Sequence, residues 1–221
     1  MSVIPSSSFE RNGPVHFQPL EWELRQLEGQ FSGAVLNAGC GNRDISDILK
    51  RMGAESVTNV DIASTIPGAI LSSLDSLPLE SGRFDTVFCN AVLEHVVSID
   101  AVMAELKRVT KPGGRLVIAI PFLQPYHESP TDFRRFTAPG MRQLGERHGL
   151  TTLLVQPVHS IAQTLGWILW AHLLDTGSRV RQILFWPVIW LMTRFWHRGN
   201  PRALTAANTF QAVYEKPKPA D

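Results

Sequence analysis

The chain of 221 residues is long enough to form one ordinary domain with a buried core. Its formal net charge of +1 gives no overall field that would favour nucleic acid or a strongly acidic partner. The two cysteines, Cys40 and Cys89, lack the spacing of a metal site, so we expect no metal and a reducing, cytoplasmic setting. Residues 1–12 are polar and predict no signal peptide, and residues 1–17 are expected to be a flexible N-terminus.

Beyond this terminus, short apolar runs alternate with amphipathic ones. Helices are expected over 19–30, 45–52, 101–109 and 139–148, and strands over 34–38, 56–60, 69–71, 84–89, 115–120, 150–155 and 209–214. Asp44 is expected to cap the second helix, and residues 111–114 read as a turn. Alternating strands and helices predict an α/β fold, a Rossmann-like, mostly parallel sheet with helices on both faces, whose core spans 18–158.

A glycine-rich turn lies between the first strand and the second helix, in Asn37-Ala-Gly39-Cys-Gly41-Asn-Arg-Asp44. Glycine lets a ligand approach the backbone closely, and the helix N-terminus offers amide donors. A turn without any ligand is an equal alternative. A dinucleotide fingerprint would need a third glycine where Asp44 stands, which disfavours a nucleotide-dependent oxidoreductase.

Asp61 ends the second strand, about twenty residues after this turn. An acidic side chain at that position can accept hydrogen bonds from both hydroxyl groups of a ribose. The alternative is a helix N-cap, since Asp is common after strands. The distance from the glycine turn favours the ribose role.

The motif Val35-Leu-Asn-Ala-Gly-Cys-Gly41 resembles the first motif of the class I S-adenosylmethionine-dependent methyltransferases. Further matches follow in order over residues 33–122: Leu77-Pro-Leu79 with Phe84-Asp85, Leu93-Glu-His95, and Arg108-Val-Thr-Lys-Pro-Gly-Gly114. The ordered set resembles the small-molecule branch of this family, which includes quinone-ring methyltransferases. The resemblance implies S-adenosylmethionine as cofactor and a seven-stranded sheet whose last strand is antiparallel.

The resemblance also implies which residues hold the cofactor. They are Asn37, Gly39, Cys40, Gly41, Asp61, Ile62, Ser73, Leu74 and Asn90. Gly39 and Gly41 would approach the methionyl and ribose part, Ile62 would lie against adenine, and Asn90 would border the methionine moiety. Many relatives have an Asp for the adenine amino group where this chain has Ser73, so Ser73 or the backbone of Leu74 is expected to make that contact.

Residues 121–137 are dense in His, Asp, Arg and aromatic side chains and leave the sheet at its ligand-binding edge. We expect part of the acceptor site here, with His127 as general base and Asp132 orienting it or contacting substrate. Arg134 or Arg135 is expected to hold an anionic group, and Tyr126 and His95 to contact the acceptor. An internal ion pair between Asp132 and an arginine is an equal alternative, and His95 is equally well explained as a packed histidine.

Five of the six tryptophans fall within residues 159–204, where two apolar runs precede the last strand and tail at 205–221. Each run is shorter than the ~20 residues of a spanning helix. From Thr176 to Arg202 arginines occur without any acidic residue. This helical insertion is expected to be a membrane-interface segment (residues 160–200), a lid over the active site, or a homodimer contact.

The sequence therefore predicts methyl transfer from S-adenosylmethionine to a small-molecule or lipid- or glycan-linked acceptor. The alternatives are a non-catalytic S-adenosylmethionine-binding module that anchors partners at a membrane, and the disfavoured oxidoreductase. No basic stripe with interleaved aromatics lies near the predicted site, so a nucleic-acid substrate is not expected. The expected location is the cytoplasm, with contact to the inner membrane face.

Overall fold

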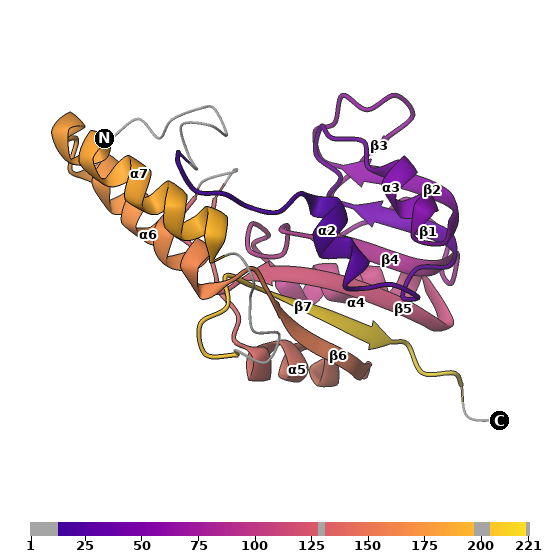
Figure 1. Ribbon diagram of the computed structural model, residues 1–221. Coiled ribbons are helices and arrows are strands. Elements are labelled where there is room, and N and C mark those ends of the chain that lie inside the picture. The colour runs from indigo at the N-terminus through magenta and orange to yellow at the C-terminus, as the bar shows by residue number, and fades with distance from the viewer. Residues whose placement is uncertain (1–12, 128–130, 197–203, 220–221) are drawn as a thin grey trace.

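The computed structural model describes residues 13–127, 131–196 and 204–219 (Figure 1). Its strands are β1 (Gly33–Ala38), β2 (Ala54–Asp61), β3 (Ile70–Leu71), β4 (Phe84–Asn90), β5 (Thr110–Pro121), β6 (Thr151–Val158) and β7 (Thr209–Glu215). Its helices are α2 (Leu20–Arg25), α3 (Ser46–Arg51), α4 (Ile99–Val109), α5 (Ala138–Arg147), α6 (Ile161–Asp175) and α7 (Arg179–Phe195).

The seven strands form one sheet in the order β3-β2-β1-β4-β5-β7-β6. The pairs from β3 to β5 are parallel, whereas β7 is antiparallel to both β5 and β6. The predicted Rossmann-like, mostly parallel seven-stranded sheet with an antiparallel last strand is thus confirmed. The carboxyl ends of β1, β2 and β4 meet at one edge, where ligands of such sheets bind.

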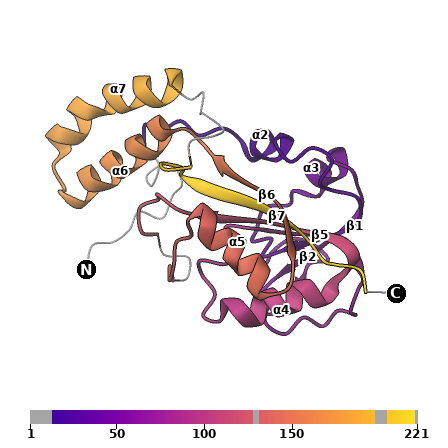
Figure 2. The ribbon, with the colours of Figure 1, turned by 90° about the horizontal axis from the view of Figure 1, so that it is seen from below.

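Successive residues of a strand point to opposite faces of the sheet. Both faces of the central strands are apolar, and helices cover both of them. Val87 packs in one core with residues of α4 and α5, while Phe88 packs in a second core with Leu24 of α2 and Leu49 of α3. Figure 2 shows the two helix pairs on opposite sides of the sheet. The two apolar layers explain why the central strands are apolar without alternation.

Several element boundaries differ from those expected. Helix α2 ends five residues early, because the chain turns at residues 26–30 with Gly29 at φ +75. Asp44 is not the N-cap of α3; that position is Ile45, and Asp44 instead accepts a hydrogen bond from the backbone N–H of Ser46 at 2.9 Å. The expected turn at 111–114 lies in β5, where Gly113 has φ +76 and the register with β4 shifts between Phe84 and Thr86.

The expected helical insertion is present as α6 and α7, a hairpin that extends away from the sheet (Figures 1 and 2). A capping box at Ser160 and Gln163 begins α6. Residues 13–17 run along the hairpin: Val15 packs with Trp170, and the His16 N–H donates to Thr193 Oγ1 at 3.0 Å. The N-terminus expected to be flexible spans residues 1–17; its residues 13–17 make these contacts with the hairpin, and residues 1–12 lie outside the described residues.

Candidate active site

The glycine turn joins β1 to α3 and follows the expected geometry. Gly39 and Gly41 both adopt positive φ, +77 and +56, a region that favours glycine. A Cβ on Gly39 would lie 2.3 Å from Val92 Cγ2, so the turn packs closely on the segment after β4. A Cβ on Gly41 would meet nothing within 4 Å. Gly41 therefore borders open space that a ligand can fill.

Asp61 ends β2 directly beside this turn. One carboxylate oxygen accepts a hydrogen bond from the Gly41 N–H at 2.8 Å, and the other accepts one from the Ala63 N–H at 2.9 Å. Each carboxylate oxygen keeps a further lone pair for a donor such as a ribose hydroxyl. The sequence relates Gly41 and Asp61 only through their separation of about twenty residues, and the structure shows that they are in direct contact.

Asn37 and Cys40 stabilise the turn from within. Asn37 is 3% exposed and donates to Asn59 Oδ1 at 2.8 Å, so its side chain links β1 to β2. Ser64 Oγ donates to the Gly41 carbonyl at 2.6 Å and lies 3.6 Å from Cys40 Sγ. Burial raises the pKa of the Cys40 thiol, and the nearby Asp61 charge adds to this shift. Asn37 and Cys40 therefore support the turn, and their contact with a cofactor stays a prediction.

The remaining expected cofactor residues differ in exposure. Ile62 is 64% exposed at the end of β2, and Asn90 is half-buried at the end of β4. Leu74 is buried in the main core, so only its backbone can face a ligand. The Ser73 carbonyl accepts a hydrogen bond from Ser72 Oγ at 3.1 Å.

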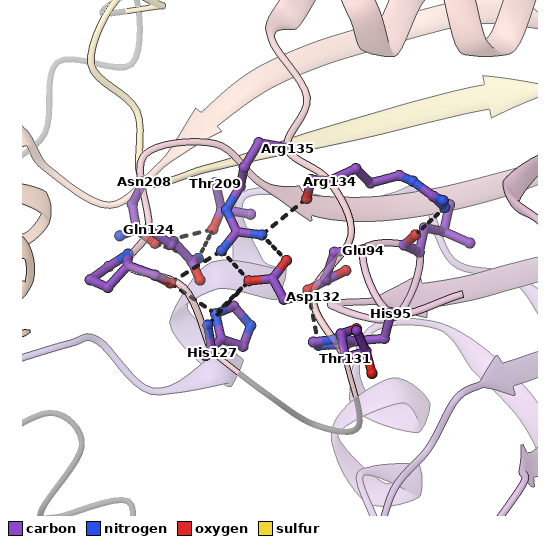
Figure 3. Close-up of polar contacts among 12 residues, drawn as sticks. Glu94, His95, Gln124, His127, Thr131, Asp132, Arg134, Arg135, Asn208 and Thr209 are labelled. Atoms are coloured by element: carbon purple, nitrogen blue, oxygen red, sulfur yellow. Dashed lines mark hydrogen bonds and ion pairs between the residues drawn. The ribbon is translucent and has the colours of Figure 1, made fainter. Parts of the chain in front are cut away.

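His127 lies in the segment after β5, half-buried beside His95 (Figure 3). Its Nδ1 is 3.1 Å from the Pro125 carbonyl, which can only accept, so Nδ1 carries the hydrogen. The opposite nitrogen, Nε2, then keeps a lone pair. Burial lowers the pKa of His127, an effect that its contacts with Pro125 and Asp132 offset only in part. The imidazole is therefore neutral near pH 7 and able to accept a proton.

Asp132 forms the ion pair that the sequence left as an alternative. Its side chain is 2% exposed and accepts hydrogen bonds from two nitrogens of the Arg135 guanidinium (Figure 3). Burial raises the pKa of Asp132, but hydrogen bonds from Arg135 and from the His127 N–H at 3.2 Å make the net shift downward. The carboxylate lies 3.6 Å from His127 Nδ1, so it positions the backbone of His127 rather than bonding its ring.

Both arginine side chains expected to hold an anion are engaged within the protein. The Arg134 guanidinium donates to the carbonyls of Leu93, Val96 and Val97 at 2.7 to 3.1 Å. Arg135 also donates to the Pro125 carbonyl at 3.1 Å. The Arg134 contacts fix the segment after β5 to the segment after β4, and the Arg135 contact joins two parts of the segment after β5. The Tyr126 side chain is 58% exposed, and its contact with an acceptor stays a prediction.

Glu94 lies at the centre of this region, although the sequence gives no sign of its burial. Its side chain is fully buried, and within the described part of the chain neither carboxylate oxygen has a hydrogen-bond partner. Burial raises the pKa of Glu94 to about 7. His95 lies beside it, with Nε2 3.8 Å from Glu94 Oε1 and Nδ1 2.9 Å from the Thr131 carbonyl.

The donor atoms of Glu94, His95 and His127 lie within 4.8 Å of one another. One carboxylate and two imidazoles at this spacing are close enough to share a divalent cation. The expectation that the chain holds no metal therefore stays a prediction. Trp167 of α6 completes the region: its indole stacks on His127, a contact that no sequence pattern indicates.

Comparison with known proteins agrees with this geometry. Residues 36–118 match the family model described as a methyltransferase domain. The ubiquinone biosynthesis O-methyltransferase of Xanthomonas euvesicatoria pv. vesicatoria (strain 85-10) is 34% identical over 137 residues, which cover 54% of this chain and 55% of that protein. The chain thus spans about half the length of the curated relatives it matches.

Solved structures share the fold over most of the chain. The Burkholderia thailandensis 1,6-didemethyltoxoflavin-N1-methyltransferase, solved with S-adenosylhomocysteine, has a TM-score of 0.57 at 15% identity and covers 94% of this chain and 79% of its own. An S-adenosylmethionine-dependent methyltransferase from Mesorhizobium loti has a TM-score of 0.55 at 13% identity and covers 89% and 98%. Residues 36–118 therefore resemble a methyltransferase domain, and the chain shares its fold with solved S-adenosylmethionine-dependent methyltransferases.

Proposed function

We propose that the protein transfers a methyl group from S-adenosylmethionine to a hydroxyl group of a small-molecule acceptor. The observation that carries this proposal is the meeting of Gly41 and Asp61 at the ends of two adjacent parallel strands, with open space on the Cβ side of Gly41. A carboxylate for ribose hydroxyls beside a backbone that a ligand can approach closely is what this cofactor requires.

The residues at this edge fit the cofactor. Asp61 would hold the ribose hydroxyls, Gly39 and Gly41 would border the methionyl and ribose part, and Ile62 offers an exposed apolar surface for adenine. When bound, the cofactor supplies an electrophilic methyl group on a sulfonium. The protein's task is then mainly to position the acceptor in line with that group.

His127 is the proposed general base. Its Nε2 lone pair takes the proton of the acceptor hydroxyl, while the Pro125 carbonyl holds Nδ1–H and fixes the ring. Oxygen as the methylated atom is supported by relatives named ubiquinone biosynthesis O-methyltransferases, and a quinone-type or other lipid-linked acceptor fits this branch. A glycan-linked acceptor is the other candidate from the sequence.

The proposal includes a cytoplasmic location. Cys40 and Cys89 are both free thiols, which suits a reducing compartment. For the hairpin of α6 and α7, within residues 160–200, the sequence offers three alternatives, which are contact with the inner membrane face, a lid over the active site and a homodimer contact.

The first test is calorimetric titration with S-adenosylhomocysteine. Asp61→Ala should weaken binding at least tenfold, because hydrogen bonds to a charged group contribute about 1.5 kcal/mol or more each. Glu55→Ala is the matched control, since it removes an exposed carboxylate from the other end of β2. Absence of binding by the unaltered protein would overturn the proposal, and so would equal affinities of the Asp61→Ala variant and the unaltered protein.

The second test is turnover with a panel of hydroxylated aromatic acceptors, with and without a lipid tail. His127→Ala should abolish methyl transfer and leave the affinity for S-adenosylhomocysteine unchanged. Full turnover by His127→Ala would exclude the base role. Tight cofactor binding without turnover on any acceptor of the panel would favour the non-catalytic binding module.

A further inference from the structure

The α6–α7 hairpin exposes an apolar helix on almost every side. Only Ile189 and Thr193 of α7 are buried, where they contact Gly166 of α6. Most large apolar side chains elsewhere on α7 are 39% to 72% exposed, among them Ile183, Leu184, Val188, Leu191 and Phe195. An apolar helix of this kind is normally covered, either by protein or by lipid.

The dimensions of the hairpin favour lying on a bilayer over crossing it. Helix α6 has 15 residues and α7 has 17, and among the described helices none combines the length and hydropathy of a membrane span. A shorter apolar helix with basic side chains instead lies in the plane of the interface. Trp186 and Trp190 stack one turn apart on α7, with ring centroids separated by 6.5 Å, and tryptophan is enriched at that depth.

The positive charge of the hairpin favours contact with an anionic lipid surface. From residue 176 to residue 202 the sequence has no acidic residue, and Arg179, Arg181 and Arg194 lie exposed on α7. Arginine stems can lie along apolar surface while their guanidinium groups reach lipid phosphates. Each basic residue near an anionic leaflet adds to the attraction between the hairpin and the lipid headgroups.

A second copy of the chain is less compatible with the charge of α7 than an anionic lipid surface is. In a symmetric pair each patch meets itself, so two antiparallel α7 helices would bring Arg179 and Arg181 of one protomer toward Arg194 of the other. Like charges at such a contact oppose association. Asp175 is the only acidic residue in the hairpin sequence 161–196, and one carboxylate in each copy cannot balance both Arg179 and Arg181.

We propose that the α6–α7 hairpin docks on an anionic lipid bilayer, with α7 lying in the headgroup region. Trp167, near the start of α6, contacts His127, so docking places the candidate active site at the base of the docked hairpin. The docking surface goes beyond methyl transfer and does not depend on it. Its test accordingly uses no acceptor.

The test is sedimentation of the full chain with vesicles of phosphatidylcholine alone or with about one-third phosphatidylglycerol. We expect binding to the anionic vesicles, at least tenfold weaker binding to neutral ones, and release by high salt. Ile183→Ser with Leu184→Ser should weaken binding at least tenfold, and Arg179→Ser with Arg181→Ser should weaken it on anionic vesicles only. Leu153→Ser, at an exposed apolar residue of β6, is the matched control and should bind as the unaltered protein does.

Three outcomes would overturn the proposal. Failure to bind anionic vesicles would exclude lipid as the occupant, and equal binding to neutral vesicles would exclude recognition of headgroup charge. A dimer in light scattering that Ile183→Ser with Leu184→Ser dissociates, in a protein that ignores vesicles, would assign α7 to a second copy. Unchanged S-adenosylhomocysteine binding by the variants separates loss of docking from loss of the fold or of the proposed function.

Discussion

Trp167 stacks on the imidazole of His127, with ring centroids 6.3 Å apart and ring planes inclined by 27°. The same indole meets Phe17 edge-on, with ring centroids 5.3 Å apart, so the segment before α2 also packs against it. The surroundings of the candidate base are thus built partly by the sheet edge and partly by the hairpin. A change in the hairpin can therefore alter the chemistry of His127 without touching the cofactor residues.

Replacement of Trp167 should change the proton affinity of His127. Burial lowers the pKa of this imidazole, and Trp167→Ala would admit water to one ring face, so the pKa should rise toward the ordinary value for histidine. The measurement is an NMR titration of the histidine ring signals. Trp167→Phe keeps an aromatic cover and should shift the midpoint less, whereas Trp186→Ala, elsewhere on the hairpin, should not shift it. An unchanged midpoint in Trp167→Ala would contradict the contact.

Glu94 should make the protein less stable as the pH rises. Burial raises its folded-state pKa to about 7 from an ordinary 4.5, so folding holds this proton more tightly than the unfolded chain does. The resulting loss of stability begins near the unfolded pKa, grows as the pH rises, and is complete above the folded pKa. Glu94→Gln cannot ionise, so relative to the unaltered protein it should gain about 3 kcal/mol between about pH 4 and pH 8.

Urea denaturation of both proteins across this range measures that difference. The neighbouring residues His95, His127, Asp132 and Arg135 are the same in both proteins, so the comparison isolates the Glu94 carboxyl. Glu80→Gln, at an exposed glutamate, should give a curve parallel to that of the unaltered protein. Parallel curves for Glu94→Gln would mean that the Glu94 carboxyl is solvated or paired in solution.

The sequence predicted the residues of the candidate cofactor site better than it predicted the contacts of the candidate acceptor site. Gly39 directly follows β1, Gly41 lies two residues further on, and Asp61 is the last residue of β2. Their positions therefore depend on local structure and on the parallel pairing of β1 with β2. The burial of Glu94 depends on how residues 131–135 fold over it, and that packing joins segments about 40 residues apart. No local pattern encodes such contacts, which is also why the choice between a catalytic and an ion-paired Asp132 stayed open.

The pair of Asp132 and Arg135 should hold the segment that carries His127. Asp132→Ala would leave the Arg135 guanidinium, 24% exposed, without its carboxylate, so unfolding should become easier by about 3 kcal/mol. The stability that Asp132 contributes is present above its unfolded pKa and is lost as the pH falls through its lowered folded pKa. Urea denaturation at about pH 7 and about pH 3 measures both effects.

A double-mutant cycle separates the ion pair from a direct role of Asp132 at the ring. If the carboxylate acts through Arg135, then Asp132→Ala with Arg135→Met should be more stable than Asp132→Ala alone. Asp132→Ala should then lower kcat by disordering His127, and it should leave the pH profile controlled by the same imidazole. Additive losses of stability in the double variant would show that the two side chains act independently.

Gly39 and Gly41 should respond differently to alanine although both have positive φ. Alanine in this region costs roughly 1–2 kcal/mol at either position. At Gly39 the new methyl would also collide with Val92, so Gly39→Ala should lose about 3 kcal/mol of stability in all. At Gly41 the methyl enters open space, so Gly41→Ala should lose only the stability that alanine costs at positive φ. It should also bind S-adenosylhomocysteine at least tenfold more weakly, because the methyl occupies the space proposed for the cofactor.

The control is Gly177→Ala, in the α6–α7 turn, where φ is +65 and the surroundings are equally open. It should show the same loss of stability as Gly41→Ala and keep full affinity for S-adenosylhomocysteine. Calorimetric titration and urea denaturation of the three variants give both quantities, and full affinity in Gly41→Ala would mean that the cofactor lies elsewhere.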